Sequence, residues 1–118
     1  ETSEVVKQLM FDASSSDTVR SRSVTGKPVR MLRNAWTSGW DSEGNPESLG
    51  APMQMLVSGE ALARINRYPE KGKNIACAPV GQIVGKMQST ISAKDQVMEM
   101  VMGYLDATEH LTALLNEE

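Results

Sequence analysis

The most regular apolar pattern of the chain runs from Ser92 to the C-terminus. Ser92 is a suitable helix cap, and Asp95 follows three residues later, as at many helix starts. Beyond them, apolar side chains recur on one face at helical spacing: Val97, Val101, Leu105, Leu111, Leu114 and Leu115. The sequence therefore predicts a long amphipathic helix that continues to the end of the chain.

A second helix is predicted over residues 3–13. Ser3 can cap it, and an apolar stripe follows at helical spacing: Val5, Val6, Leu9, Met10 and Ala13. The polar run of residues 14–17 ends this helix. Residues 18–24 are expected to be extended, although Val19 and Val24 do not alternate cleanly with polar neighbours.

Residues 25–28 predict a turn followed by a helix start, because Pro28 fits the first helical turn. Apolar and basic side chains then continue at helical spacing: Val29, Leu32, Arg33 and Trp36. Gly39 is expected to end that helix. The glycine- and proline-rich residues 40–52 predict an irregular loop.

A further helix is predicted from Met53 to about Asn66. Its expected core positions are Met55, Leu56, Leu62, Ala63 and Ile65. Residues 74–79 are expected to be extended, and residues 80–87 to form a short helix entered through a glycine. The predicted fold class is therefore mostly α, with little strand.

Charge and composition argue against several kinds of protein. The net charge is -3, so we do not expect a nucleic-acid binder, even though basic residues cluster between Arg20 and Arg33. No apolar run reaches the length of about 18 residues typical of a membrane span. The polar start of the chain does not resemble a signal peptide. With Cys77 as the only cysteine, no internal disulfide can form, and a reducing, cytoplasmic location is expected.

No familiar catalytic constellation is visible in the sequence. His110 is the only histidine and lies far from Cys77, so neither a metal site nor a catalytic residue is predicted within the chain. His110 is interpreted as a surface or packing residue of the C-terminal helix. Cys77 lies between two alanines and is interpreted as a small buried hydrophobe.

Two segments offer binding chemistry, each with a structural alternative. Gly81 precedes a short helix, where a ligand can approach the backbone, and Gln82 can donate and accept hydrogen bonds. The alternative for this segment is a tight contact between helices that requires small residues. Arg30 and Arg33 share a face of their predicted helix and can bind a carboxylate or phosphate. Their alternative is a solvated or ion-paired basic face.

Trp36 and Trp40 are a third candidate. They flank a glycine and can line a substrate pocket. The more common role of such a pair is one core residue and one loop anchor.

Three stretches, in this order, resemble the nitronate monooxygenase (2-nitropropane dioxygenase-like) family. Residues 17–22 (DTVRSR) and 25–34 (TGKPVRMLRN) are similar to the family's D-T-v-x-T-R and T-G-R-P-A-R-x-x-x-N motifs. Residues 81–85 (GQIVG) resemble its A-G-Q-x-x-G-L-I segment. Residues 1–3 resemble the end of the segment that follows the family's last barrel strand, and the family also ends in an amphipathic helix. Residues 40–75 add little to the resemblance.

The resemblance implies the C-terminal fragment of an FMN-binding (β/α)8 TIM-barrel enzyme with a smaller helical substrate domain. Residues 1–16 would form an outer barrel helix, residues 17–90 a substrate-domain or lid segment, and residues 91–118 the terminal helix. The catalytic histidine and the loops that hold most of the FMN would lie upstream of Glu1, so the fragment alone would be inactive.

The resemblance also implies a role for individual residues. Gly81, Gln82 and Ile83 match the segment that approaches the flavin ring. Many members carry a small or polar residue at the position of Ile83, and Lys27 stands where the family has an arginine. Lysine keeps the charge but lacks the fork geometry of arginine.

The implied activity is oxidation of a small nitro or nitronate compound by FMN and O2. The implied partners are a small-molecule substrate and the upstream barrel of the same chain. Relatives in the family also include enoyl reductases and NAD(P)H:quinone reductases. A different class of function remains open as well: a free-standing helical interaction module without enzyme activity, which would use the amphipathic faces of residues 3–13 and 92–117.

Overall fold

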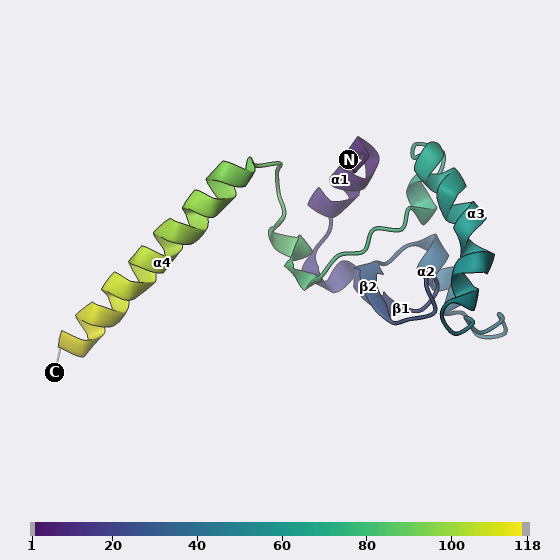
Figure 1. Ribbon diagram of the computed structural model, residues 1–118, viewed down its shortest axis with the longest axis horizontal. Coiled ribbons are helices and arrows are strands. Elements are labelled where there is room, and N and C mark those ends of the chain that lie inside the picture. Colours follow the sequence, from purple (N-terminus) through teal and green to yellow (C-terminus); the bar gives the residue numbers. More distant parts are fainter. Residues whose placement is uncertain (1, 117–118) are drawn as a thin grey trace. The chain divides into compact units, whose positions relative to one another are not determined.

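The computed structural model describes residues 2–116. The chain divides into two compact units, residues 1–88 and residues 89–118. The first contains four kinds of element in turn, shown in Figure 1: α1 (Glu4–Phe11), η1 (Ser15–Asp17), β1 (Thr18–Ser21), β2 (Val29–Leu32), α2 (Ala35–Trp40), α3 (Met53–Arg67), η2 (Lys73–Ile75) and η3 (Gln82–Lys86), where η denotes a 3-10 helix. The second unit contains α4 (Ala93–Asn116). The described part of the chain is thus mostly helical with a small two-stranded sheet, as the sequence predicts.

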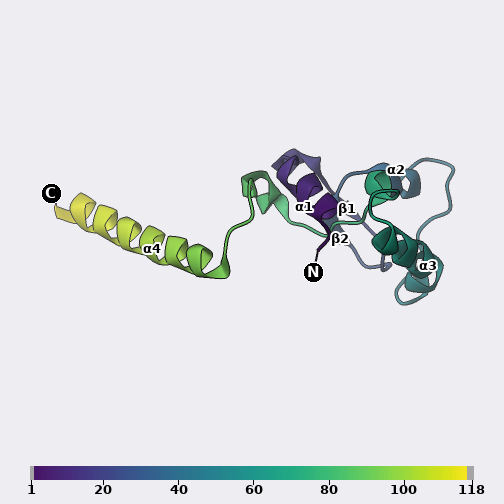
Figure 2. The same cartoon turned by 90° about the horizontal axis from the view of Figure 1, so that it is seen from above.

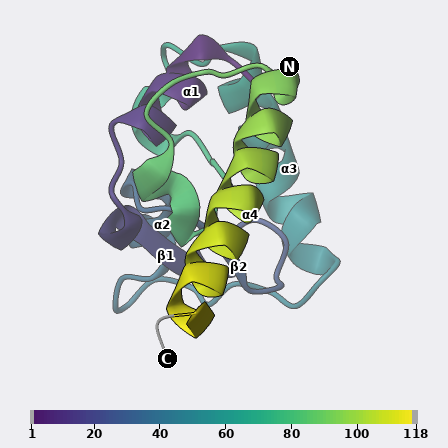
Figure 3. The same cartoon turned by 90° about the vertical axis from the view of Figure 1, so that its left-hand side faces the viewer.

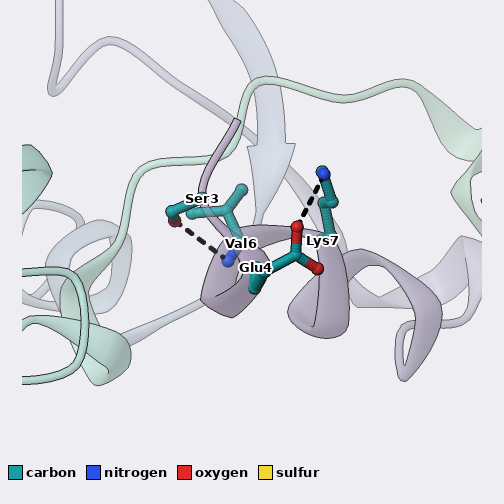
Figure 4. A network of polar contacts seen from close by, with 4 residues as sticks. All are labelled: Ser3, Glu4, Val6 and Lys7. Carbon is teal, nitrogen blue, oxygen red and sulfur yellow. Dashed lines mark hydrogen bonds and ion pairs between the residues drawn. The ribbon is translucent and has the colours of Figure 1, made fainter. Parts of the chain in front are cut away.

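Helix α1 begins as its sequence predicts. The Ser3 hydroxyl accepts a hydrogen bond of 3.4 Å from the Val6 N–H, which satisfies a donor that the first turn would otherwise leave free (Figure 4). Glu4 lies in the first turn and pairs with Lys7, with 2.7 Å between Oε1 and Nζ. The acidic side chain also suits the positive end of the helix dipole.

Strands β1 and β2 pair antiparallel, with Thr18 opposite Leu32 and Ser21 opposite Val29. The helix predicted over residues 28–39 is therefore wrong in its first half, because residues 29–32 are extended. Cross-strand backbone hydrogen bonds, which no local pattern reveals, override the helical spacing of this stretch.

The turn between the strands depends on Gly26. Its φ is +78°, a left-handed conformation that glycine adopts without penalty. A Cβ at this position would lie 2.5 Å from the Leu49 carbonyl oxygen and 2.6 Å from the Ala51 nitrogen. The turn expected at residues 25–28 is therefore present, packed directly against the backbone of the later loop.

Residues 78–80 run along the free edge of β2 and complete the core. The Leu32 N–H donates to the Ala78 carbonyl at 3.1 Å, and the Val80 N–H donates to the Arg30 carbonyl at 3.1 Å. Leu32, Ala78 and Val84 are buried together, and side chains of α1 pack on them: Val6, Leu9, Met10 and Ala13. The extended conformation expected for residues 74–79 is confirmed from Ala76 onward, after η2.

Helix α2 is short and begins at a capping box. The Asn34 side-chain oxygen accepts from the Thr37 N–H at 3.1 Å, and the Thr37 hydroxyl accepts from the Asn34 N–H at 3.0 Å. The Asn34 amide also donates to the Ala76 carbonyl at 2.8 Å, which joins α2 to the chain after η2. Gly39 does not end this helix, which continues to Trp40.

Helix α3 extends over the predicted residues but buries a different face. Of the expected core positions only Ile65 is buried; Leu62 is half-buried, Ala63 is exposed, and Met55 and Leu56 are exposed by 55% and 75%. The buried neighbours of Ile65 on α3 are Gln54 and Ser58. Gln54 Nε2 donates to the Ser23 carbonyl at 2.8 Å, and the Ser58 hydroxyl donates to the Val24 carbonyl at 2.8 Å.

These bonds explain the orientation of α3. The turn before β2 presents backbone carbonyls, and carbonyls buried away from water need donors. Polar side chains therefore occupy the face where an apolar stripe is expected. Figure 2 shows α3 and α1 on either side of the strand pair.

Helix α4 is one uninterrupted helix of 24 residues (Figure 3). The Ser92 hydroxyl accepts from the Asp95 N–H at 3.1 Å and donates to its carboxylate at 2.7 Å, so the predicted cap is confirmed. None of the residues of α4 is buried. Within residues 2–116, no helix is both long enough and apolar enough to cross a membrane.

Candidate functional site

The segment predicted to approach a ligand, Gly81–Ile83, lies at the start of η3. Gly81 is the N-cap residue of this 3-10 helix, in extended conformation, and its carbonyl accepts from the Val84 N–H at 3.1 Å. Val84 is completely buried in the core, so η3 is anchored by the residue that follows the segment. The short helix entered through glycine is thus confirmed as a 3-10 helix.

The backbone of the segment is held from α1's side of the unit. The Ser15 hydroxyl donates a hydrogen bond of 2.7 Å to the carbonyl of Gln82. A Cβ on Gly85 would lie 2.5 Å from the Ser15 hydroxyl oxygen and 2.8 Å from the Ser15 nitrogen. Glycine at position 85 therefore permits the close approach of η1 and η3 that this bond requires. The small-residue explanation considered for this stretch applies to Gly85.

The three candidate residues themselves face outward. All are exposed, Ile83 by 59%. The Cβ position of Gly81 has the Ile83 side chain, 4.0 Å away, as its nearest neighbour beyond the adjacent residues. Within residues 2–116 the Gln82 side-chain amide makes no hydrogen bond, since only its backbone carbonyl is bonded. The segment thus presents open backbone, a free amide and an apolar side chain.

The predicted pair of arginines is not brought together on a helix. Arg30 lies on β2 and its guanidinium donates to the Thr18 hydroxyl at 3.0 Å, whereas Arg33 follows the strand. Residues three apart on an extended chain point to opposite faces. The shared face proposed for an anion is therefore wrong. Lys27 lies in the turn before β2 and is exposed.

Arg33 instead lies beside Asp17, across a cleft of about 490 Å³ whose lining also includes Asp12 and Lys73. The Ser14 hydroxyl and backbone N–H donate to the Asp17 carboxylate at 2.7 and 2.8 Å and lower its pKa, and Arg33 lowers it further. Sequence reasoning singled out none of the acidic side chains of this cleft. The serine run before Asp17 was the available signal, since a serine three residues before an acidic residue favours a capping box.

Cys77 is half-buried and lines another cavity, of about 530 Å³, next to Pro79 and α1. Burial raises the pKa of its thiol to about 11. A thiol with this pKa is almost fully protonated near neutral pH, so it is a poor nucleophile. The interpretation of Cys77 as a packing residue rather than a reactive one fits this environment, although it is less buried than expected.

Trp36 and Trp40 do line a pocket together. Their ring centroids are 6.3 Å apart and the ring planes are tilted by 47°. His110 lies on α4 in the second unit. Within residues 2–116, no group of three or more histidine, cysteine or acidic side chains is arranged to hold a metal ion.

The comparisons with known proteins give one relative. A protein of Mycobacterium tuberculosis named "Putative monooxygenase Rv1533" is 43% identical to this chain over 119 aligned residues, which cover 98% of the chain and 32% of the relative. The chain thus spans about a third of the length of the curated relative it matches. No protein-family model matches the chain. No solved structure matches it either.

Proposed function

We propose that this chain is part of an FMN-dependent monooxygenase that oxidises a small nitronate with O2. The observation that carries the proposal is the 43% identity, along almost the whole chain, to a protein named as a monooxygenase. The order of the motifs that resemble nitronate monooxygenases narrows that general activity to a flavin enzyme. The rest of such a protein would contain the (β/α)8 barrel, the loops for the FMN phosphate and the catalytic histidine.

The geometry of residues 81–83 fits contact with a planar ring. Gly81 has open space where a side chain would stand, so a ring can approach the backbone closely. The free amide of Gln82 offers a donor and an acceptor, and a flavin ring carries both kinds of group at its edge. Ile83 supplies apolar contact. The bond from Ser15 fixes the backbone while the side chains of residues 82 and 83 remain available.

In this proposal the flavin supplies the redox chemistry, and the protein supplies binding and orientation. Gly81, Gln82 and Ile83 would position one edge of the ring and exclude water from it. No residue of this chain is assigned a proton transfer. The 118-residue chain alone is expected to be inactive.

The test uses the longer protein that contains this sequence. It should purify with bound FMN and consume O2 when supplied with propane-2-nitronate, with release of nitrite. The 118-residue chain should do neither. FMN-bound protein that instead oxidises NAD(P)H with a quinone or an enoyl thioester would replace the nitronate activity with that of another relative. Absence of bound flavin would contradict the proposal entirely and favour an interaction module.

The role of Gln82 has its own test. In the longer protein, Gln82→Leu should raise the Kd for FMN by about 3- to 10-fold, since one net hydrogen bond is worth roughly 0.5–1.5 kcal/mol. Gln88→Leu is the matched control, because Gln88 is also exposed but lies beyond η3. Equal FMN affinity of the two variants would remove Gln82 from the site and leave the monooxygenase proposal standing.

A further inference from the structure

The pocket beside α2 combines an apolar lining with both indole rings of the chain. The sequence has two tryptophans, Trp36 and Trp40, and both line it. The remaining walls come from three separate places, α2 itself, the loop that follows and η2: Ala35, Gly39, Asn45, Pro46 and Ile75. None of these side chains is ionisable. The cavity measures about 370 Å³, which is within the usual range of small-ligand sites, about 300–1,000 Å³.

The loop is fastened over the helix. The Asn45 side-chain amide donates to the Gly39 carbonyl, which lies in the last turn of α2. Asn45 and Pro46 are therefore held against the tryptophans by a specific bond as well as by apolar contact. This bond favours a preformed pocket.

A second observation is independent of the shape of the pocket. The indole nitrogen of Trp36, Nε1, is buried yet donates to no acceptor within residues 2–116. It is the exception among the buried polar side chains of this part of the chain, since Thr37, Gln54 and Ser58 all have partners. A buried donor without a partner costs roughly 1–3 kcal/mol. An acceptor supplied by a ligand would remove that cost.

We propose that this pocket binds an uncharged, planar aromatic molecule bearing an acceptor oxygen, such as an aryl ketone. The ring would stack at a tilt against the indoles, as aromatic pairs prefer, and the oxygen would accept from Trp36 Nε1. A charged ligand is disfavoured, because its desolvation would be uncompensated by a lining without ionisable groups. The proposal concerns residues 35–46 and 75 and does not rest on the proposed FMN site.

The chain itself provides the reporter for the test. In a 15N-labelled sample of the full 118-residue chain, the indole N–H groups give two NMR signals, one for each tryptophan. Acetophenone and ethylbenzene are the probes, because both carry one benzene ring and a two-carbon substituent, but acetophenone alone has the carbonyl oxygen. Acetophenone should shift both indole signals, with the larger downfield shift at Trp36, and should bind about 3- to 10-fold more tightly than ethylbenzene.

Matched variants separate the hydrogen bond from ring packing. Trp36→Phe keeps an aromatic ring but removes the donor, so the preference for acetophenone over ethylbenzene should disappear. Trp40→Phe should weaken both probes while it preserves the preference. The remaining indole signal in each variant reports whether the chain is still folded.

Three outcomes would overturn the proposal. Equal affinities of the two probes would show that the Trp36 donor has no role in recognition. Loss of the preference in Trp40→Phe but not in Trp36→Phe would assign it to the wrong ring. Binding of neither probe would show that the pocket does not take a small aromatic ligand, and a segment of a longer chain would then be the better candidate for its occupant.

Discussion

The hydroxyl of Ser15 donates a 2.7 Å hydrogen bond to the backbone carbonyl of Gln82, across 67 residues of sequence. This bond connects η1 to the segment whose side chains are proposed to meet a flavin. It involves the backbone of Gln82 and therefore leaves the side-chain amide available. Serine at position 15 thus positions the segment without taking part in its chemistry.

Gly85→Ala should destabilise the first unit by about 1–3 kcal/mol, the usual cost of overpacking. The new methyl carbon would lie 2.8 Å from the backbone nitrogen of Ser15, which cannot move aside as a side chain can. Urea unfolding followed by tryptophan fluorescence measures the loss, because both tryptophans lie in this unit.

Gly59→Ala is the control for that substitution. Gly59 lies within α3, and no atom is found within 4 Å of its Cβ position. Alanine there should stabilise the unit by about 0.5–1 kcal/mol, because glycine is the poorer helix former. Two alanine variants that were equally unstable would contradict the proposed contact between Gly85 and Ser15.

Gln54→Leu should cost about 2–3 kcal/mol of unfolding free energy, even though leucine is the more apolar residue. Gln54 is completely buried, and its amide donates to the Ser23 carbonyl while its oxygen accepts from the Leu49 N–H at 2.9 Å. Leucine would leave the buried carbonyl without a partner. Met55→Gln, on the exposed side of the same helix, should change stability by less than about 0.5 kcal/mol. A neutral Gln54→Leu would show that packing alone docks α3.

Cys77 should react slowly with iodoacetamide in the folded chain. A pKa of about 11 in place of the usual 9.0 lowers the thiolate fraction near neutral pH roughly 100-fold, and the thiolate is the reactive form. The pH profile of the labelling rate should therefore rise towards about 11 in buffer and towards 9.0 in urea. Because the folded-state pKa is raised, stability should fall as the pH rises from 9.0 towards 11. Equal labelling rates in buffer and urea would contradict the burial of this thiol.

Asp17 should contribute stability at neutral pH that disappears in acid. Hydrogen bonds from Ser14 lower its pKa below the usual 3.8, so the stabilisation is complete above 3.8 and is lost as the pH falls through the lowered value. Asp17→Asn should therefore give a flatter dependence of the urea midpoint on pH below about 4. Ser14→Ala, which removes the hydroxyl donor but keeps the backbone donor, should lie between the two. A parallel loss in all three proteins would assign the acid sensitivity to other carboxylates.

Local signals in the sequence were sufficient where an element depends on its own residues. Ser3 and Ser92 cap helices, and the apolar periodicity between their caps and ends gives α1 and α4 correctly. Gly81 before a short apolar stretch indicated η3, because a glycine and a helix start are both local features. The spacing of Trp36 and Trp40, one helical turn apart, likewise brings the two rings to one side of α2.

Only the tertiary structure decided the elements that depend on distant partners. Residues 29–32 have helical spacing, yet they form a strand because β1 on one edge and residues 78–80 on the other supply their hydrogen bonds. The polar side of α3 is buried because it faces carbonyls of the turn at residues 23 and 24. The bond from Ser15 to Gln82 and the unpartnered nitrogen of Trp36 could not be read from any window of sequence. Sequence patterns record which residues a segment contains, whereas the free energy of a buried polar group depends on the atoms that folding places beside it.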